Sequence, residues 1–226
     1  MNRYNIFNQI HKGLRNLLYE TALLIQRTDF LNKEESAIAL DRVREVVELF
    51  EKHAHTEDTY VLPALTEYEP AVVNVFEEEH VKDHELSEKL LGYVYALKQS
   101  QLDDTKVEMG RALGIAYVEF MIFNLAHMAK EENVINKLLW RYYADEQLQD
   151  ITRTIVSNSP PEAFAKMARH MIRGINNSEI ITWFTQVKAT APPFVYAGLA
   201  AIAAAEVPER WEVIRNRLNV EEALVA

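Results

Sequence analysis

Apolar residues recur at helical spacing along the first two thirds of the chain. From about Asn5 to Arg27 they fall three or four residues apart, which is the period of one face of an α-helix. The same spacing predicts helices from Asn32 to about Pro63, from Pro70 to about Gln99 and from about Thr105 to Tyr143. No strand pattern is seen. The sequence therefore predicts an all-α protein whose four long helices pack as an antiparallel up-down four-helix bundle, because their connections are short.

Local signals predict where these helices begin and end. Asn32, followed by Glu35 three residues later, resembles a capping box. Pro63 is expected to end or kink the second helix, because its ring cannot continue the hydrogen-bond ladder. Pro70 suits the first turn of the third helix, and Asp103-Asp104 is expected to cap the fourth.

The character of the sequence changes beyond Asp145. Three to five short helices are predicted there, separated by proline- and asparagine-rich breaks. We therefore predict a four-helix bundle at residues 1–145 and a C-terminal helical extension at residues 146–226, packed on the bundle or mediating interactions. The alanine-rich run of 13 residues from Val195 to Val207 is shorter than the roughly 20 residues of a membrane span, and it is predicted to form a buried helix.

Composition and charge narrow the classes of partner and ligand. The net charge of −10 argues against nucleic acid and anionic membranes as partners. The chain has no cysteine, so any metal must be bound by nitrogen and oxygen atoms. The absence of cysteine and of an apolar signal segment suits a cytoplasmic protein.

The histidines are distributed over all four predicted bundle helices. Three of these helices carry a histidine and a second ligand-type residue four positions later, which lie about 40° apart on one helical face. The predicted metal ligands are His11, His53, Glu57, His80, His84, His127 and Glu131.

The three spaced pairs continue apolar stripes, so their imidazoles are predicted to point inward; His53, for example, follows Phe50 by three residues. A single inward histidine is more often a hydrogen-bonded core residue than a ligand. Agreement between four helices favours a metal centre, since coordination offsets the cost of burying polar groups. His55 and His170 are predicted to be structural or surface residues, and Glu77–Glu79 a solvated face.

The number of ligands bears on the choice among iron, manganese, zinc and copper. Five imidazoles, two bridging carboxylates and a bridging oxygen would fill about eleven of the roughly twelve positions around two octahedral ions. One position would stay open, which favours a dinuclear iron site for a small molecule such as dioxygen.

The seven predicted ligands and their spacing resemble those of the hemerythrin-like family, over about residues 5–143. Pro63, ten residues after His53, is similar to that family's second-helix pattern. The resemblance implies two iron ions bridged by an oxo or hydroxo group and by carboxylates.

By position, the resemblance assigns each ligand a role. His80, His84 and His127 would bind one iron, and His11 and His53 the other, where the open position would lie. Glu57 and Glu131 would bridge the two ions. The family's oxygen carriers place an aspartate five residues after the fourth-helix histidine; Glu132 has that offset here, whereas Glu131 has the better facing, so both remain candidates.

Three functions follow from the resemblance. The first is binding, storage or sensing of dioxygen or a related small ligand in a pocket lined by Leu14, Leu18, Phe50 and Phe123. The second is a di-iron enzyme acting on peroxide, nitric oxide or oxygen, in which Tyr60 or Tyr117 could donate protons or electrons.

The third is an iron- or oxygen-responsive interaction protein that uses its C-terminal helices for a homodimer or a protein partner. Five aromatic residues there would form either a core or a docking surface: Trp183, Phe184, Phe194, Tyr196 and Trp211.

Overall fold

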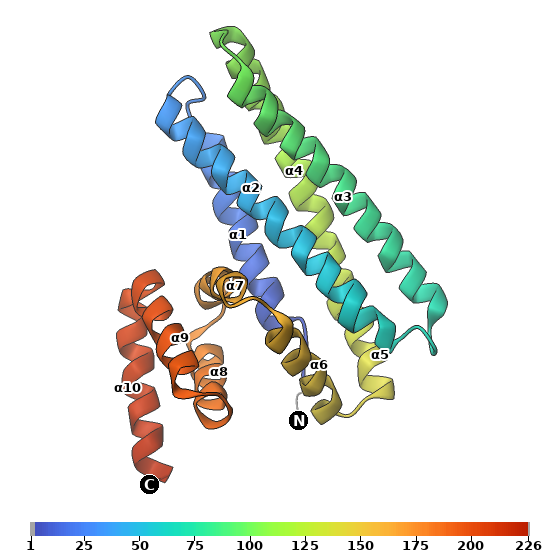
Figure 1. Ribbon diagram of the computed structural model, residues 1–226, viewed down its shortest axis with the longest axis vertical. Helices are drawn as coiled ribbons and strands as arrows, with labels where there is room; N and C mark the ends of the chain where they lie inside the picture. Colours follow the sequence, from blue (N-terminus) through green and yellow to red (C-terminus); the bar gives the residue numbers. More distant parts are fainter. Residues whose placement is uncertain (1–2, 226) are drawn as a thin grey trace. The chain divides into compact units, whose positions relative to one another are not determined.

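The computed structural model describes residues 3–225, and no strand lies among them. The long helices are α1 (Asn8–Arg27), α2 (Lys33–Thr56), α3 (Pro70–Gln99) and α4 (Asp103–Asn133), drawn in Figure 1. A π-helical turn η1 (Glu57–Val61) and a 3₁₀ turn η2 (Leu62–Ala64) follow α2. The shorter helices are α5 (Ile135–Tyr142), α6 (Asp145–Asn158), α7 (Pro161–Gly174), α8 (Asn177–Thr190), α9 (Pro193–Glu206) and α10 (Pro208–Val225).

The chain divides into two compact units. The first comprises the residues up to Phe7 and Leu17–Ser157, and the second comprises Asn8–Asn16 and the residues from Asn158 onward. The first unit thus runs further along the chain than the predicted boundary at residue 145. The helix α1 contributes residues to both units.

Two of the predicted helix starts are confirmed. The Asn32 side chain accepts hydrogen bonds from the backbone N–H groups of Glu34 and Glu35, at 3.0 and 3.3 Å, and its amide donates to Glu35 Oε1 at 3.0 Å. Pro70 is the first residue of α3, where its missing N–H has no intrahelical acceptor to lose.

Two other predicted starts are wrong by a few residues. The helix α1 begins at Asn8 rather than Asn5, because Asn5 Oδ1 accepts the Phe7 N–H at 2.9 Å and holds this segment in a turn. The helix α4 begins at Asp103 itself. Asp103 and Asp104 therefore lie in its first turn, where negative charge is favourable, and do not cap it.

The predicted fourth helix is interrupted at Val134. The Asn133 side chain donates to the Ala129 carbonyl at 2.7 Å, the acceptor that its own backbone N–H would use in a continuing helix. A separate helix, α5, then resumes at Ile135.

The first unit has the predicted all-α bundle core. Each of α2, α3 and α4 buries one apolar face, and the Phe50 and Phe120 rings meet edge to face at 5.3 Å. The Tyr117 hydroxyl donates to the Leu18 carbonyl at 3.2 Å and so joins α4 to the later part of α1. A fully buried side chain of this size stabilises the fold by about 1.5–3 kcal/mol.

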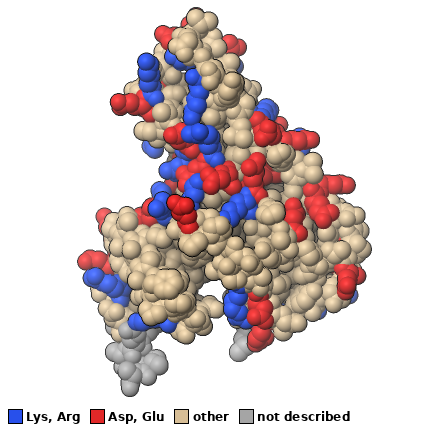
Figure 2. Space-filling model, in the orientation of Figure 1, with Lys and Arg blue, Asp and Glu red and all other residues tan. Residues whose placement is uncertain are grey.

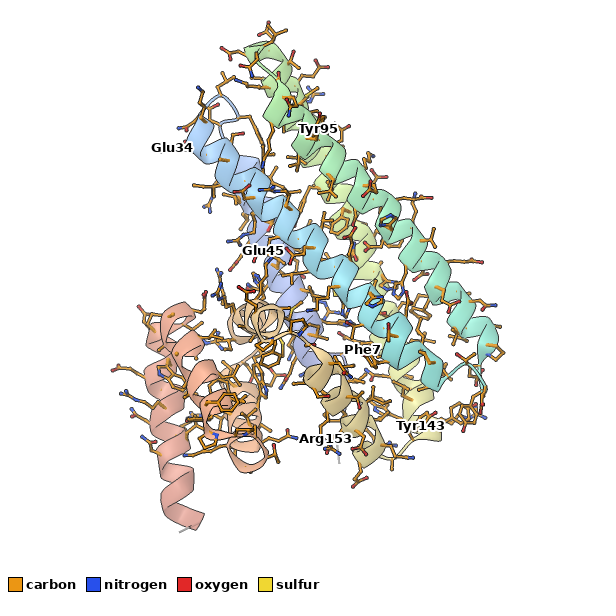
Figure 3. The ribbon with its side chains drawn as sticks, in the orientation of Figure 1. Phe7, Glu34, Glu45, Tyr95, Tyr143 and Arg153 are labelled. Atoms are coloured by element: carbon orange, nitrogen blue, oxygen red, sulfur yellow. The ribbon has the colours of Figure 1, made fainter. Side chains whose placement is uncertain are left out.

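A satellite core explains why the first unit extends beyond residue 145. Leu148 on α6 is fully buried in a cluster with Phe7, Phe76 and Leu139. Tyr143 packs at the edge of the same cluster, and Figure 3 labels both Phe7 and Tyr143. Because α6 is part of this core, it belongs with the bundle.

The second unit has its own core. Of the five aromatic residues that were expected to form a core or a docking surface, Phe184 and Trp211 are buried in this core, whereas Trp183 and Tyr196 pack at its edge. Phe194 is 74% exposed. Most of these aromatics therefore act as core residues.

Two glycines allow close backbone contact within the second unit. A Cβ atom at Gly174 would lie 2.3 Å from the Lys12 carbonyl oxygen, and one at Gly13 would lie 2.8 Å from the Met171 backbone nitrogen. Both positions therefore exclude any larger side chain unless the backbones move apart.

The alanine-rich run is only partly buried. It forms a helix, α9, as predicted, but only Leu199 and Ala203 are buried on it, so the prediction that this helix is buried is wrong. Its small side chains leave little apolar area to bury on the outer face.

Among the residues that the structure describes, one stretch is long and apolar enough to span a membrane. This is Asp103–Tyr142, whose most apolar window has a mean hydropathy of 1.4. Because it supplies Phe120 and Met128 to the bundle core, we interpret it as a core helix. On the face drawn in Figure 2, acidic and basic side chains are intermingled, and pairs such as Arg44 with Asp41 are formed within one helix.

Candidate metal centre

The last turn of α2 and the start of η1 bring His53 and Glu57 to the bundle interior. Both continue the buried face that includes Val46 and Phe50, and their side chains are only 8% and 3% exposed. The four-residue spacing sets them on one helical face. His53 Nε2 lies 3.1 Å from Glu57 Oε1.

The helix widens directly after this pair. In η1 the Leu62 N–H bonds to the Glu57 carbonyl, five residues back, and Pro63 then offers no N–H at all. The predicted kink near Pro63 is therefore a π-helical turn followed by a 3₁₀ turn. Glu57 and Asp58, at the start of the turn, both reach toward α3.

Both ring nitrogens of His80 face carboxylates. Nδ1 lies 2.7 Å from Asp58 Oδ1, and Nε2 lies 3.4 Å from Glu57 Oε2. Burial alone would lower the pKa of His80, but its contacts with Asp58 and Glu57 outweigh burial and raise that pKa to about 10.

His127 on α4 has a similar environment. Its Nε2 lies 3.1 Å from Glu131 Oε1, and its Nδ1 lies 2.8 Å from Glu79 Oε2. Burial would lower the pKa of His127, yet Glu131 and Glu79 raise it overall. Burial alone would raise the pKa of Glu79, but Lys130 and His127 lower it overall.

These side chains form two overlapping sets of donor atoms. Glu57, His80, His127 and Glu131 each offer one atom, and these atoms all lie within 4.8 Å of one another. His53 likewise offers an atom within 4.8 Å of Glu57 and Glu131. All five residues are buried, and Glu57 and Glu131 belong to both sets.

The donor set fits a cation. Imidazole nitrogens and carboxylate oxygens suit divalent iron, manganese and zinc. A bound cation would also offset the cost of burying two carboxylates close together. Two adjacent cations could share the carboxylates that belong to both sets.

The prediction that His84 is an inward ligand is wrong. Its side chain is 64% exposed, and its Nδ1 lies 3.4 Å from Glu51 Oε1 at the surface. The buried seam of α3 passes through Val73, Phe76, His80 and Asp83, with steps of three, four and three residues. The next buried position after His80 is therefore Asp83, three residues later, and His84, four residues later, points outward.

Asp83 occupies the inward position that had been assigned to His84. It is 3% exposed, and its Oδ1 accepts a hydrogen bond from Asn124 Nδ2 at 2.6 Å. Burial raises its pKa. The heptad spacing of Val73, Phe76 and His80 was the signal that could have identified Asp83.

Glu79 was also missed, since Glu77–Glu79 was predicted to be a solvated face. Glu77 and Glu78 are exposed, whereas Glu79 is half-buried and contacts both His127 and Lys130. This pairing joins two helices, and no local pattern could reveal it.

The remaining predicted residues can be placed individually. Glu131 is 1% exposed whereas Glu132 is half-buried, so the structure favours Glu131 as the donor. His55 is exposed and His170 is buried in α7, and their non-ligand roles stay predictions. His11 is buried on α1, in the segment that groups with the second unit, and its role as a ligand stays a prediction.

The structure also places several residues of the predicted apolar lining and both predicted tyrosines. Phe50 is buried, and the Phe123 ring stacks on His127 with centroids 6.1 Å apart. Tyr117 is buried with its hydroxyl bonded to a backbone carbonyl, so it acts as a core residue, and burial raises its pKa. Tyr60 is half-buried on η1.

Comparisons with known proteins agree with this geometry. The family model described as "Hemerythrin HHE cation binding domain" matches residues 2–139. The F-box/LRR-repeat protein 5 of Mus musculus and that of Bos taurus are each 22% identical over 172 residues, which cover 76% of this chain and 24% of the relative. The chain thus spans about a quarter of the length of these relatives. No solved structure gives a significant match.

Proposed function

Because this chain belongs to the hemerythrin HHE cation-binding family, we propose that its bundle binds two iron ions side by side and takes up dioxygen or a related small ligand. The observation that carries this proposal is the sharing of Glu57 and Glu131 between the two donor sets. A carboxylate that reaches two clusters of donors can bridge two cations. The predicted ligand His11 would complete the set around the iron beside His53.

The residues of the centre have distinct parts in this proposal. His80 and His127 would hold one iron, and His53 with His11 the other. An iron pair supplies redox chemistry toward small molecules such as dioxygen. Phe50 is buried on α2, one turn before His53, and the Phe123 ring stacks on His127, so both would help to keep water away from the centre.

The metal content and the optical spectrum test this proposal. The chain, reconstituted with ferrous iron without air, is expected to hold about two irons and to develop charge-transfer bands in air that bleach when oxygen is removed. A folded protein that binds no iron would refute the proposal. Two irons that oxidise irreversibly would favour the alternative, an enzyme acting on peroxide, nitric oxide or oxygen.

A matched pair of variants tests the bridging carboxylate. Glu131→Gln is expected to lose at least one iron per chain, because the buried Glu131 belongs to both donor sets. Glu132→Gln changes the same charge one residue later and is expected to keep both. Equal iron content in the two variants would contradict the assignment.

In the same proposal, the second unit would bind a protein partner or a second copy of the chain. Its support is the exposed Phe194 on α9 and the name of the similar proteins, which joins an F-box to LRR repeats. A change in oligomeric state or in proteolysis between iron-free and iron-loaded protein would support a sensing role.

A further inference from the structure

Two successive carboxylates flank one imidazole of the candidate centre. Glu57 approaches Nε2 of His80 while Asp58 contacts Nδ1 of the same ring at 2.7 Å. In an α-helix, successive side chains diverge by about 100° around the axis. Both carboxylates lie in the π-helical turn η1, where the backbone departs from that geometry.

The second imidazole of the same donor set has an equivalent arrangement from other elements. Glu131 approaches Nε2 of His127, and Glu79 on α3 contacts Nδ1 at 2.8 Å. Glu79 is itself held by Lys130, whose Nζ also lies 4.9 Å from the centroid of the Phe76 ring. Both imidazoles thus direct Nε2 toward the shared carboxylates and Nδ1 toward an outer one.

This arrangement bears on the tautomer of each ring. A neutral imidazole carries one N–H, and only its other nitrogen has a lone pair for a cation. A carboxylate that accepts from Nδ1–H keeps the proton there and fixes the ring orientation, which leaves Nε2 available.

We infer that Asp58 and Glu79 are positioning residues of the cation centre, which hold His80 and His127 in the tautomer and orientation that bind a cation through Nε2. The inference rests on the proposed function, because it concerns the same centre. Neither residue is among the predicted ligands, and neither offers an atom to the buried donor sets.

Cobalt(II) titration of the metal-free full-length chain provides the test. Asp58→Ala and Glu79→Ala are expected to weaken cobalt binding by about 10–100-fold, the usual effect of losing such a partner. Asp58→Asn keeps an acceptor oxygen and is expected to restore part of the affinity. Glu78→Ala is the matched control, because Glu78 is the exposed neighbour of Glu79 on the same helix.

Nitrogen NMR of the zinc-loaded protein distinguishes positioning from general destabilisation. His80 is expected to carry its proton on Nδ1 in the unaltered chain and to show mixed tautomers or a free ring in Asp58→Ala. Circular dichroism checks that each variant folds. Asp58 is 41% exposed in its side chain, and Asp58→Asn provides a milder change should Asp58→Ala unfold.

The outcomes separate this inference from the proposed function. If Asp58→Ala and Glu79→Ala bind cobalt as tightly as the unaltered chain does, the positioning role is refuted while the dinuclear centre stands. If the unaltered chain binds a single cobalt that these variants weaken, the positioning role is supported and the dinuclear proposal fails. If the unaltered chain binds none, both are refuted.

Discussion

His80 and His84 stand one turn apart on α3 and have opposite environments. The side chain of His80 is 6% exposed and that of His84 is 64% exposed. The four-residue rule places two residues on one helical face, but a bundle seam alternates steps of three and four residues. The rule holds for His53 with Glu57 and for His127 with Glu131, because there the seam takes a step of four.

This difference predicts unequal effects of two identical substitutions. His80→Ala is expected to lose at least one iron per chain, because it removes a buried donor. His84→Ala is expected to retain the full iron content and to change stability by less than about 0.5 kcal/mol, as surface substitutions do. Iron content after anaerobic reconstitution provides the measurement, and loss of iron in His84→Ala would restore that residue as a ligand.

The sequence alone could predict the inward direction of His53, His80, His127 and Glu131, since each continues an apolar stripe. It could not predict Asp58 or Glu79 as partners of these histidines. The contact between Glu79 and His127 crosses 48 positions, and the contact between Asp58 and His80 depends on a π-helical turn. Neither leaves a periodic signal.

At the scale of elements, helix existence was easier to predict than helix ends. The long helices follow from hydrophobic period, which many residues determine together. Their ends depend on single side chains, such as Asn5 before α1 and Asn133 at the end of α4. Each of these bonds its own local backbone, and sequence does not reveal whether such a bond will form.

Replacing a glycine by alanine is expected to have opposite effects on stability in two of the helices. Gly174→Ala is expected to destabilise the chain by about 1–3 kcal/mol, because its Cβ would overlap the Lys12 carbonyl. Gly198→Ala on α9 meets nothing within 4 Å and is expected to stabilise by about 0.5–1 kcal/mol through helix propensity. Chemical denaturation measures both, and a stabilising Gly174→Ala would contradict the close backbone approach.

At the scale of the whole molecule, the two compact units are not two consecutive pieces of sequence. The segment Asn8–Asn16 packs with helices that follow it by about 150 residues or more. Glu179 on α8 accepts from Asn8 Nδ2 and pairs with Lys12. The predicted division at residue 145 could not anticipate this, because composition changes along the chain do not record such distant pairs.

The pairing of Glu179 predicts a pH dependence. Burial alone would raise the pKa of Glu179, but its contacts with Asn8 and Lys12 lower that pKa below its usual value of 4.5. Its contribution to stability is therefore present above about pH 4.5 and is lost as the pH falls through the lower, folded-state pKa. The metal-free chain is expected to lose stability in this window, and Glu179→Gln to lose less.

Thermal unfolding between pH 3 and 6, in steps, measures this effect. Glu162→Gln is the control, because Glu162 is exposed in the first turn of α7. A pH profile for Glu179→Gln that matches the profile of the unaltered chain would show that the pairing contributes nothing to folding.

The turn η1 has a consequence for insertions and deletions. A π-helical turn spans one residue more per hydrogen bond than an α-helical turn does. Deletion of one residue within Glu57–Val61 would let the backbone return to α-helical bonding at little cost to the rest of α2. Deletion of Thr59 or Tyr60 would keep Asp58 after Glu57 but return the two side chains to the roughly 100° separation of an α-helix. Chain length in this turn, and not only the identity of the two residues, would then decide whether adjacent carboxylates can contact a single imidazole.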